Sequence, residues 1–313
     1  MELSIFAGSA NRPLAEAIAA HMGLHLGRSL LHRFPDGELH VEVQESVRGD
    51  DVYLIQPTSP PAETHLLELL FLADACRRAG AAQLTAVIPY FGYARHDRRA
   101  SGREPVAARL LADMLQTSGV QRVVAVDLHT SALEGFFPMP LEHLSAVPLL
   151  AEAARSAIPP DTVVVAPDLG AVKLAERYAS LLHLPLAVVH KTRLSGDEVR
   201  AQAVVGSVNS RVPLVVDDMI STGGTIQAAL QALRAAGCEP TDGTVLTSHA
   251  LLVGPAEARL RAGSLRRLLV TDSVLPPAGI SLPVQTVSVG PLLAEAVRRL
   301  HRHESLSDLL TQG

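Results

Sequence analysis

Short apolar runs alternate with longer amphipathic segments along most of this chain. The short runs are continuous in Val, Ile and Leu, which is typical of parallel strands buried on both faces of a sheet. The longer segments place apolar residues at helical spacing. The pattern predicts an α/β fold with doubly wound parallel sheets. Its strands are expected at Leu3–Phe6, Val52–Gln56, Leu84–Ile88, Val123–Asp127, Thr162–Ala166, Leu186–Val189, Leu214–Asp217 and Gly243–Ala250.

Four amphipathic segments give the clearest predicted helices. These are Glu63–Ala79, Val106–Ser118, Val172–Leu182 and Thr225–Ala236. Gly237 follows the last of them and is expected to end it in the left-handed conformation that favours glycine.

The chain also contains an internal echo that bears on its domains. The order strand, Ser/Thr-containing loop, long helix and glycine occurs at 52–81 and again at 213–238, which indicates two related domains in tandem. A length of 313 residues accommodates two domains of ordinary size. We expect an N-terminal domain over 1–147, a second domain over 148–290, and a C-terminal helix within 291–313 that packs back near the domain junction.

Composition narrows the class of protein. Hydrophobic residues make up 48% of the chain and its net charge is −5, which gives no support for a nucleic-acid partner. Cys76 and Cys238 stand alone, so neither a zinc site nor a disulfide framework is indicated. Met1–Ala10 lacks the basic residues of a signal peptide, and no apolar run is long enough to cross a bilayer. We expect a cytoplasmic protein with no membrane partner.

Polar residues follow three of the predicted strands. Asp127 and His129 come after one strand, Asp168 after the next, and Asp217 and Asp218 end a third. Ligands of doubly wound folds bind beyond the carboxyl ends of the strands. These residues are therefore candidates for a functional site.

The third strand end places two acidic residues next to a loop that could bind an anion. These features conflict unless one ligand satisfies both. Gly223 and Gly224 would let successive backbone N–H groups form an anion site at the start of the next helix. Asp217 and Asp218 accept hydrogen bonds only, and they suit a vicinal diol. Ribose 5-phosphate carries both groups. From the residues alone, the alternative is that Ser221 or Thr222 only caps the helix.

The stretch "VVDDMISTGGTI" (215–226) resembles the phosphoribosyl-binding loop shared by type I phosphoribosyltransferases and ribose-phosphate diphosphokinases. Further segments resemble the second group in order along the chain: "RFPDGELHV", "IPYFGYARHDRR", "VDLHTSALEGFF", "APDLGAV" and "HKTR". The resemblance covers nearly the whole chain. It implies tandem domains of phosphoribosyltransferase type and transfer of pyrophosphate from ATP to ribose 5-phosphate, giving phosphoribosyl pyrophosphate and AMP.

The resemblance also assigns roles to particular residues. Ribose 5-phosphate would be held by Asp217, Asp218, Ser221, Thr222, Gly223, Gly224 and Thr225. ATP would be held by Arg95, His96 and Asp97, and by Phe34, Asp36 and Glu38 of a neighbouring subunit. His129 and Asp168 would bind Mg²⁺ on the ATP phosphates. The chain has neither a Walker A sequence nor a G-x-G-x-x-G motif, so ATP must be held in another way.

For two of these assignments the residues alone favour a different interpretation. Phe34–Glu38 has the sequence of an ordinary turn built on Pro-Asp-Gly. A lone histidine such as His129 is more often a structural hydrogen-bonding residue, since Mg²⁺ prefers oxygen ligands. The ligand roles of these residues rest on the resemblance.

Lys191 and Arg193 are the candidate catalytic residues. Two cations two positions apart on a strand lie on the same face and could neutralise charge on transferred phosphates. A lone Lys-x-Arg is a common surface pair. However, of 27 basic residues only Lys173 and Lys191 are lysine, so Lys191 persists where arginine is the rule.

Three positions depart from the pattern of the resembled family. His96 stands where Gln is usual, Ala171 where a second Gly is common, and Ser221 where bacterial members usually have an acidic residue. The segment "RRASGREPVAAR" is also shorter than the loop through which common members sense phosphate and ADP. We expect a homo-oligomer, at least a dimer, with a hexamer as one candidate. A catalytically silent regulatory homologue and a type I phosphoribosyltransferase are the alternative functions.

Overall fold

The computed structural model describes residues 1–99, 101–193, 200–238 and 242–310, with only the backbone described for 191–193 and 200–202. The chain divides into two compact units. Unit 1 comprises Met1–Ser145, Ser273–Leu275 and Ser288–Gly313, and unit 2 comprises Ala146–Asp272 and Pro276–Val287. The C-terminal helix α8 (Gly290–His301) therefore belongs to unit 1.

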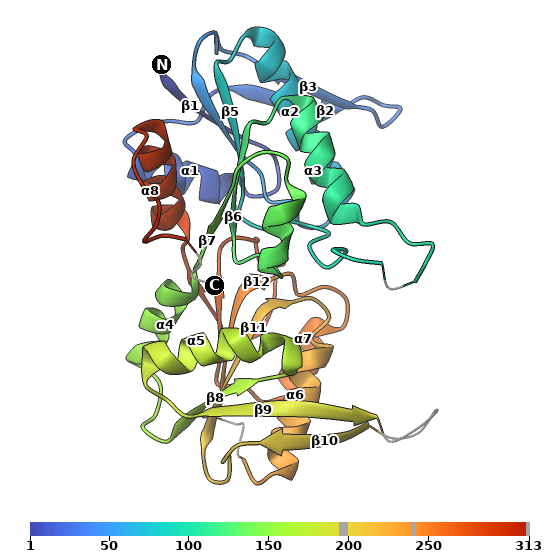
Figure 1. The fold of residues 1–313 in the computed structure, drawn as a ribbon, viewed down its shortest axis with the longest axis vertical. Coiled ribbons are helices and arrows are strands. Elements are labelled where there is room, and N and C mark those ends of the chain that lie inside the picture. The colour runs from blue at the N-terminus through green and yellow to red at the C-terminus, as the bar shows by residue number, and fades with distance from the viewer. Residues whose placement is uncertain (100, 194–199, 239–241, 311–313) are drawn as a thin grey trace. The chain divides into compact units, whose positions relative to one another are not determined.

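Unit 1 is built on a parallel sheet whose five strands lie in the order in which they occur in the chain. These are β1 (Leu3–Ala7), β4 (Asp51–Ile55), β5 (Gln83–Ile88), β6 (Arg122–Val126) and β7 (Leu141–Leu144). An antiparallel hairpin, β2 (Ser29–Arg33) and β3 (Leu39–Val43), precedes β4. Around the sheet lie α1 (Arg12–His21), α2 (Ala62–Ala79), α3 (Ala107–Ser118), the 3₁₀ helix η1 (Ser131–Phe136) and α8 (Figure 1).

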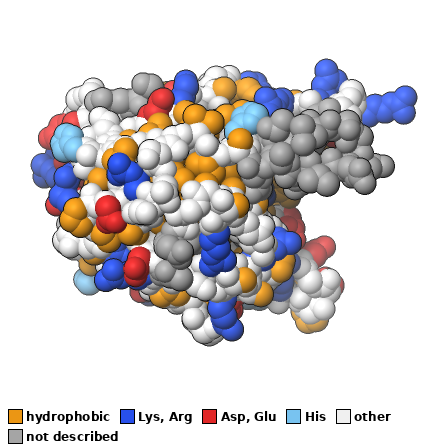
Figure 2. Space-filling model, turned by 90° about the horizontal axis from the view of Figure 1, so that it is seen from below, with side chains coloured by type: hydrophobic (Ala, Val, Ile, Leu, Met, Phe, Trp, Pro, Cys, Tyr) orange, Lys and Arg blue, Asp and Glu red, His pale blue; other side chains and the backbone are white. Residues whose placement is uncertain are grey.

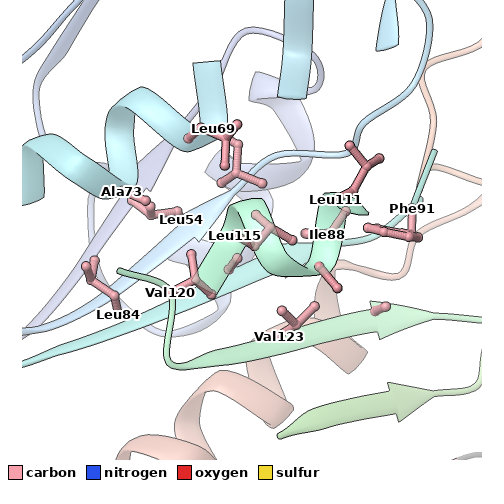
Figure 3. Close-up of a cluster of buried hydrophobic side chains, with 14 of the residues drawn as sticks. Leu54, Leu69, Ala73, Leu84, Ile88, Phe91, Leu111, Leu115, Val120 and Val123 are labelled. Carbon is pink, nitrogen blue, oxygen red and sulfur yellow. The ribbon is translucent and has the colours of Figure 1, made fainter. Parts of the chain in front are cut away.

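Helices cover both faces of the unit 1 sheet. Helices α2 and α3 pack on one face over side chains of β4, β5 and β6, as the buried cluster in Figure 3 shows. Helix α1 contacts both β1 and α8. Apolar side chains that alternate along each strand are thus buried on either side, which is why these strands lack the polar alternation of half-exposed ones.

A buried polar network closes the carboxyl ends of β1 and β4. Glu68 of α2 is 4% exposed and accepts hydrogen bonds from the Ser9 backbone N–H at 2.9 Å and from Gln56 Nε2 at 2.7 Å. The Ser9 hydroxyl also donates to this carboxylate, at 2.7 Å, and Gln56 Oε1 accepts from the Ala10 N–H at 3.1 Å. The carboxylate is therefore satisfied by donors from both strand ends.

Unit 2 contains a seven-stranded sheet whose strand order reverses. The chain starts at the inner strand β8 (Thr162–Ala166), runs outward through β9 (Leu186–Arg193) and β10 (Arg200–Val205), and returns to the other side of β8 with β11 (Val212–Ile220). β12 (Thr244–Ala250), β13 (Arg267–Thr271) and β14 (Val284–Val287) follow in order. β10 alone is antiparallel to its neighbour.

Two buried apolar clusters lie on the two faces of this sheet. One includes residues of α4 (Val147–Arg155) and α5 (Val172–Leu182), and the other includes residues of α6 (Gly224–Ala235) and α7 (Ala256–Ala262). The short 3₁₀ helix η2 (Leu169–Ala171) connects β8 to α5. Helices on both faces and a reversed strand order make unit 2 doubly wound.

The predicted fold class is confirmed, and the predicted strands are all present. Helix α5 has the predicted bounds, and Gly237 adopts the left-handed conformation that ends α6. Two strands extend several residues past their predicted ends: β9 continues to Arg193 because it pairs with β10, and β11 continues to Ile220 because it pairs with β12. Both extensions depend on a partner strand, which local apolarity does not reveal.

The surface gives little information about which kind of partner the protein binds. In the part of the chain that the structure describes, no helix is long and apolar enough to cross a membrane. On the face drawn in Figure 2, basic and acidic side chains are interspersed. The described residues on that face form no continuous basic stripe of the kind typical of nucleic-acid-binding proteins.

We predict that Gly237→Ala destabilises unit 2. Gly237 has φ of +81°, and its N–H and that of Cys238 donate to Arg234 O and Leu233 O, the two bonds of a glycine C-cap. A Cβ there would lie 2.7 Å from Asn209 Oδ1. We expect a loss of roughly 1–2 kcal/mol, measured as a lower midpoint of thermal unfolding. Gly135→Ala is the control, because Gly135 has open space and no positive φ; equal midpoints for the two variants would contradict the prediction.

Candidate active site

The reversal of strand order in unit 2 lies between β8 and β11, where a doubly wound sheet leaves a crevice for ligands. Pairing between these strands ends at Val215, opposite Val165, while β11 runs on beside β12 to Ile220. Asp217 and Asp218 therefore lie within β11, where β8 no longer covers one side. The predicted place at the strand tip is wrong, because pairing with β12 extends the strand past both carboxylates.

Asp168 approaches the same place from β8. It caps η2, where its Oδ1 accepts a hydrogen bond of 2.9 Å from the Gly170 N–H. Helix η2 contacts β11. The structure thus brings Asp168, Asp217 and Asp218 together at the carboxyl end of the unit 2 sheet.

Like charges and burial perturb the Asp217 carboxyl. Removal from water raises its pKa well above the usual range, and the charges of Asp218 and Asp168 raise it further. Its Oδ1 accepts from the Asp218 N–H at 3.0 Å, which opposes the rise. Among the described residues, no basic side chain forms an ion pair with Asp217. The site therefore favours a ligand that donates hydrogen bonds or carries positive charge.

The segment Ser221–Thr225 turns directly from β11 into α6. The cap residue is Gly223, with φ of +73°, and no side chain caps the first turn. The alternative in which Ser221 or Thr222 caps this helix is therefore wrong. The first N–H groups of a helix have no partner within it, so these remain available to an anion beside the carboxylates.

Helix α7 and the segment that precedes it support this loop. Arg259 Nη1 donates to the Thr222 carbonyl at 3.0 Å, and the Val253 N–H donates to the Ser221 carbonyl at 3.0 Å. A Cβ on Gly223 would meet Ala256 at 3.4 Å. Sequence reasoning missed Arg259, because it lies 37 positions from Thr222 and carries no local signal.

In unit 1, His129 follows β6 and is exposed. The segment before it is held by His143, whose Nε2 accepts from the Leu128 N–H at 2.8 Å and whose Nδ1 lies 3.2 Å from Glu134 Oε1. Asp127, with φ of +38°, accepts from the Ser145 hydroxyl at 3.0 Å. Sequence reasoning also missed His143, which is 5% exposed and fixes the backbone adjoining His129.

Phe34, Asp36 and Glu38 form the exposed tip of the β2–β3 hairpin. The Phe34 N–H donates to Glu38 O at 2.8 Å, and Asp36 Oδ1 accepts from the Glu38 N–H at 3.0 Å. The expected turn is therefore present. Phe34 is 44% exposed, and its ring lies against those of His32 and His40, with centroids 5.3 and 5.4 Å away. An exposed, oriented ring of this kind offers a stacking surface.

Arg95, His96 and Asp97 lie in the loop after β5, also in unit 1. Arg95 and His96 are exposed, and the His96 ring packs edge-on against Tyr93 at 5.7 Å. The Gly92 N–H donates to the Thr58 hydroxyl at 2.6 Å, which ties the start of the loop to the segment that follows β4. The loop is thus anchored at its base.

Lys191 and Arg193 lie in the second half of β9, where their backbones pair with Gln202 and Arg200 of β10. Their side chains lie outside the described residues. Among the residues that the structure describes, no three His, Cys, Asp or Glu side chains are grouped so as to hold a metal ion by themselves.

Comparison with known proteins agrees with this arrangement. Residues 3–119 match the N-terminal domain of ribose phosphate pyrophosphokinase, and residues 149–266 match the phosphoribosyl transferase domain. Ribose-phosphate pyrophosphokinase of Staphylococcus saprophyticus is 42% identical over 311 residues, which cover 98% of this chain and 96% of that protein. The chloroplastic ribose-phosphate pyrophosphokinase 2 of Oryza sativa is 43% identical over 310 residues, covering 98% and 77%.

A solved structure matches over the same extent. The crystal structure of phosphoribosylpyrophosphate synthetase from Mycobacterium smegmatis has a TM-score of 0.91 and 37% sequence identity, and the match covers 97% of this chain and 100% of that one. The resemblance seen in the sequence motifs is confirmed: the chain belongs to the ribose-phosphate pyrophosphokinase family.

Proposed function

We propose that this protein transfers a pyrophosphoryl group from ATP to the anomeric hydroxyl of ribose 5-phosphate, giving phosphoribosyl pyrophosphate and AMP. The observation that most strongly supports this proposal is the position of Asp217 and Asp218. Both lie next to the uncapped start of α6, where the strand order of unit 2 reverses. A ligand with hydroxyls at one end and phosphate at the other satisfies both. Membership of the family supports the same substrates.

Ribose 5-phosphate is assigned to β11 and the loop that follows it. Asp217 and Asp218 accept hydrogen bonds from the 2- and 3-hydroxyls. The 5-phosphate binds the loop, through the backbone N–H groups of Gly223, Gly224 and Thr225 and the hydroxyls of Ser221, Thr222 and Thr225. Gly223 and Gly224 have no Cβ atom, so the phosphate can come close to the backbone at these two positions.

ATP is assigned to loops of unit 1. Arg95, His96 and Asp97 hold the nucleotide, and the Phe34 ring stacks on adenine with Asp36 and Glu38 as polar neighbours. Because Phe34 is exposed at a hairpin tip, it is free to serve a neighbouring subunit. A homo-oligomer of at least two chains follows from such sharing, with a hexamer as one candidate size.

Mg²⁺ fits the donors present if the nucleotide completes its coordination. The described residues offer no complete cage, but Mg²⁺ is commonly held by one or two protein ligands plus phosphate oxygens and water. We assign it to His129 and Asp168, with Asp168 supplying the oxygen that a hard cation prefers. Bound there, Mg²⁺ would neutralise charge on the ATP phosphates.

Chemistry then depends on position and charge. The anomeric oxygen forms a bond to the β-phosphorus and loses its proton, while the bond from that phosphorus to the oxygen of the α-phosphate breaks and AMP departs. Little covalent work falls to the protein, so Lys191 and Arg193 act by neutralising charge on the attacking and leaving oxygens.

A single assay separates this function from its alternatives. Purified protein with ATP, Mg²⁺ and ribose 5-phosphate, but no nucleobase, should release AMP and phosphoribosyl pyrophosphate in equal amounts. A silent regulatory homologue releases neither, and a phosphoribosyltransferase requires a base. Absence of both products at any substrate concentration would exclude the proposed function.

We predict that Asp217→Asn trades ligand affinity for stability. An amide accepts less strongly from the diol, so KM for ribose 5-phosphate should rise about tenfold, a loss of about 1.4 kcal/mol, with little change in KM for ATP. The raised pKa of Asp217 means that the folded state binds this proton more tightly than the unfolded state. Ionisation therefore destabilises the fold as pH rises above the unfolded-state pKa of about 4.

The asparagine variant should accordingly have a higher midpoint of thermal unfolding than the parent at pH 7, without ligand. The gain should disappear below about pH 4, where the carboxyl is protonated in both states. Asp161→Asn, at an exposed position of the same unit, is the control. Equal increases in KM for both substrates would contradict the diol assignment.

We predict that Phe34→Ala raises KM for ATP by roughly five- to tenfold through loss of stacking, and leaves KM for ribose 5-phosphate unchanged. Leu30→Ala, which removes another exposed apolar side chain from the same hairpin, should change neither. If subunits share the site, mixing Phe34→Ala with Lys191→Ala chains should restore activity in hybrid oligomers. Failure to recover activity despite proven subunit exchange would count against sharing.

We predict that Lys191→Ala lowers kcat and kcat/KM together by roughly 10²-fold or more, because the lost charge acts on the transition state. Lys191→Arg should rescue only partly, since a guanidinium is broad and planar where lysine is a compact charge. Lys173→Ala, at an exposed position of α5, is the control. Full activity in the Arg variant would move the role to Arg193.

A further inference from the structure

Arg259 of α7 hydrogen-bonds the loop Ser221–Thr225, the proposed phosphate-binding loop, which is called the phosphate loop from here on. Its Nη1 donates to the Thr222 carbonyl at 3.0 Å. Among the described residues its guanidinium forms no ion pair, whereas Arg261, two positions on, pairs with Glu257 and contacts Ser281. The charge of Arg259 is thus left uncompensated beside the loop.

The contact fixes the orientation of one peptide group. In a trans peptide the C=O and the following N–H point in opposite directions. Holding the Thr222 carbonyl toward α7 therefore directs the Gly223 N–H away from α7, toward the other side of the loop. A peptide next to a glycine with φ of +73° can flip easily, as the central peptide of type I and type II turns does. A flip would present a carbonyl oxygen, and not an N–H, to an anion.

Packing keeps the guanidinium in place. Ala256 of α7 is fully buried, and a Cβ on Gly223 would meet it at 3.4 Å, so the helix and the loop are in close contact. A Cβ on Gly224 would lie 3.4 Å from Arg259 Nη1. The guanidinium therefore extends along 222–224, where its positive charge adds to that of the N–H groups at the start of α6.

We infer that Arg259 is a positioning residue for the 5-phosphate of ribose 5-phosphate: it holds the Thr222–Gly223 peptide in the orientation that binds the anion and adds positive charge behind it. The inference rests on the proposed function of this loop. The loop itself, Ser221–Thr225, contains no acidic residue, so it does not offset that charge.

Two substitutions and a matched control test this role. Arg259→Met keeps the apolar stem but removes the donor and the charge, and it should raise KM for ribose 5-phosphate about tenfold with KM for ATP and kcat changed less than threefold. Arg259→Lys keeps a charge and a donor and should stay within about threefold of the parent. Arg261→Met removes an arginine from the same helix without touching the loop, and it should change neither KM.

Binding gives a readout that a general loss of structure would not imitate. Ribose 5-phosphate should raise the unfolding midpoint of the parent, Arg259→Lys and Arg261→Met proteins, but at the same concentration much less that of Arg259→Met. A KM for ribose 5-phosphate within twofold of the parent in Arg259→Met, or equal increases for both substrates, would overturn the inference. If Asp217→Asn also left ribose 5-phosphate use intact, the loop's proposed function would fail instead.

Discussion

The strand reversal between β8 and β11 is the constraint on which the rest of unit 2 depends. Beyond Val215, β11 pairs with β12 but no longer with β8. The adjacent carboxylates of Asp217 and Asp218 therefore lie where β8 does not cover the strand. The same strand leads into a helix whose first N–H groups no side chain caps. Carboxylates and N–H groups prefer ligands of opposite character. A small molecule with a diol at one end and an anion at the other meets both preferences.

Several of the proposed ligand-binding residues lie in loops, and buried or packed side chains behind these loops fix their shape. His143 holds the backbone beside His129, Thr58 holds the start of the Arg95 loop, and Arg259 holds the phosphate loop. None of the three is assigned a substrate contact. Each bonds a backbone group, so what it fixes is the direction of a peptide. The backbone conformation of these loops therefore depends on side chains that come from neighbouring segments.

Much of the architecture could be predicted from local sequence, because buried parallel strands and amphipathic helices leave strong apolar patterns. Thr162–Ala166 and Val172–Leu182 were predicted with the observed bounds. The second half of β9 and the end of β11 could not be, because they are strands only through their partners β10 and β12. The β2–β3 hairpin escaped prediction because it is largely exposed and lacks a continuous apolar run.

Within the site, short-range patterns identified Asp217, Asp218 and the glycines of the phosphate loop, since their chemistry is concentrated in one stretch. They could not identify groups that arrive from elsewhere in the chain. Arg259 and His143 look like an ordinary helix arginine and an ordinary strand histidine in the sequence. Their roles come from tertiary contacts, which a single sequence does not display.

Glu68 marks a difference between the carboxyl ends of the two parallel sheets. In unit 1 its carboxylate already accepts hydrogen bonds from Ser9 and Gln56, which follow β1 and β4, so these donors are satisfied within the chain. At the carboxyl end of the unit 2 sheet, the charges of Asp218 and Asp168 instead raise the pKa of Asp217, in addition to the effect of burial. A ligand that binds only the folded state stabilises it by mass action. Binding of a sugar phosphate at the proposed site would therefore make unit 2 more resistant to unfolding, whereas the Glu68 network of unit 1 forms without a ligand.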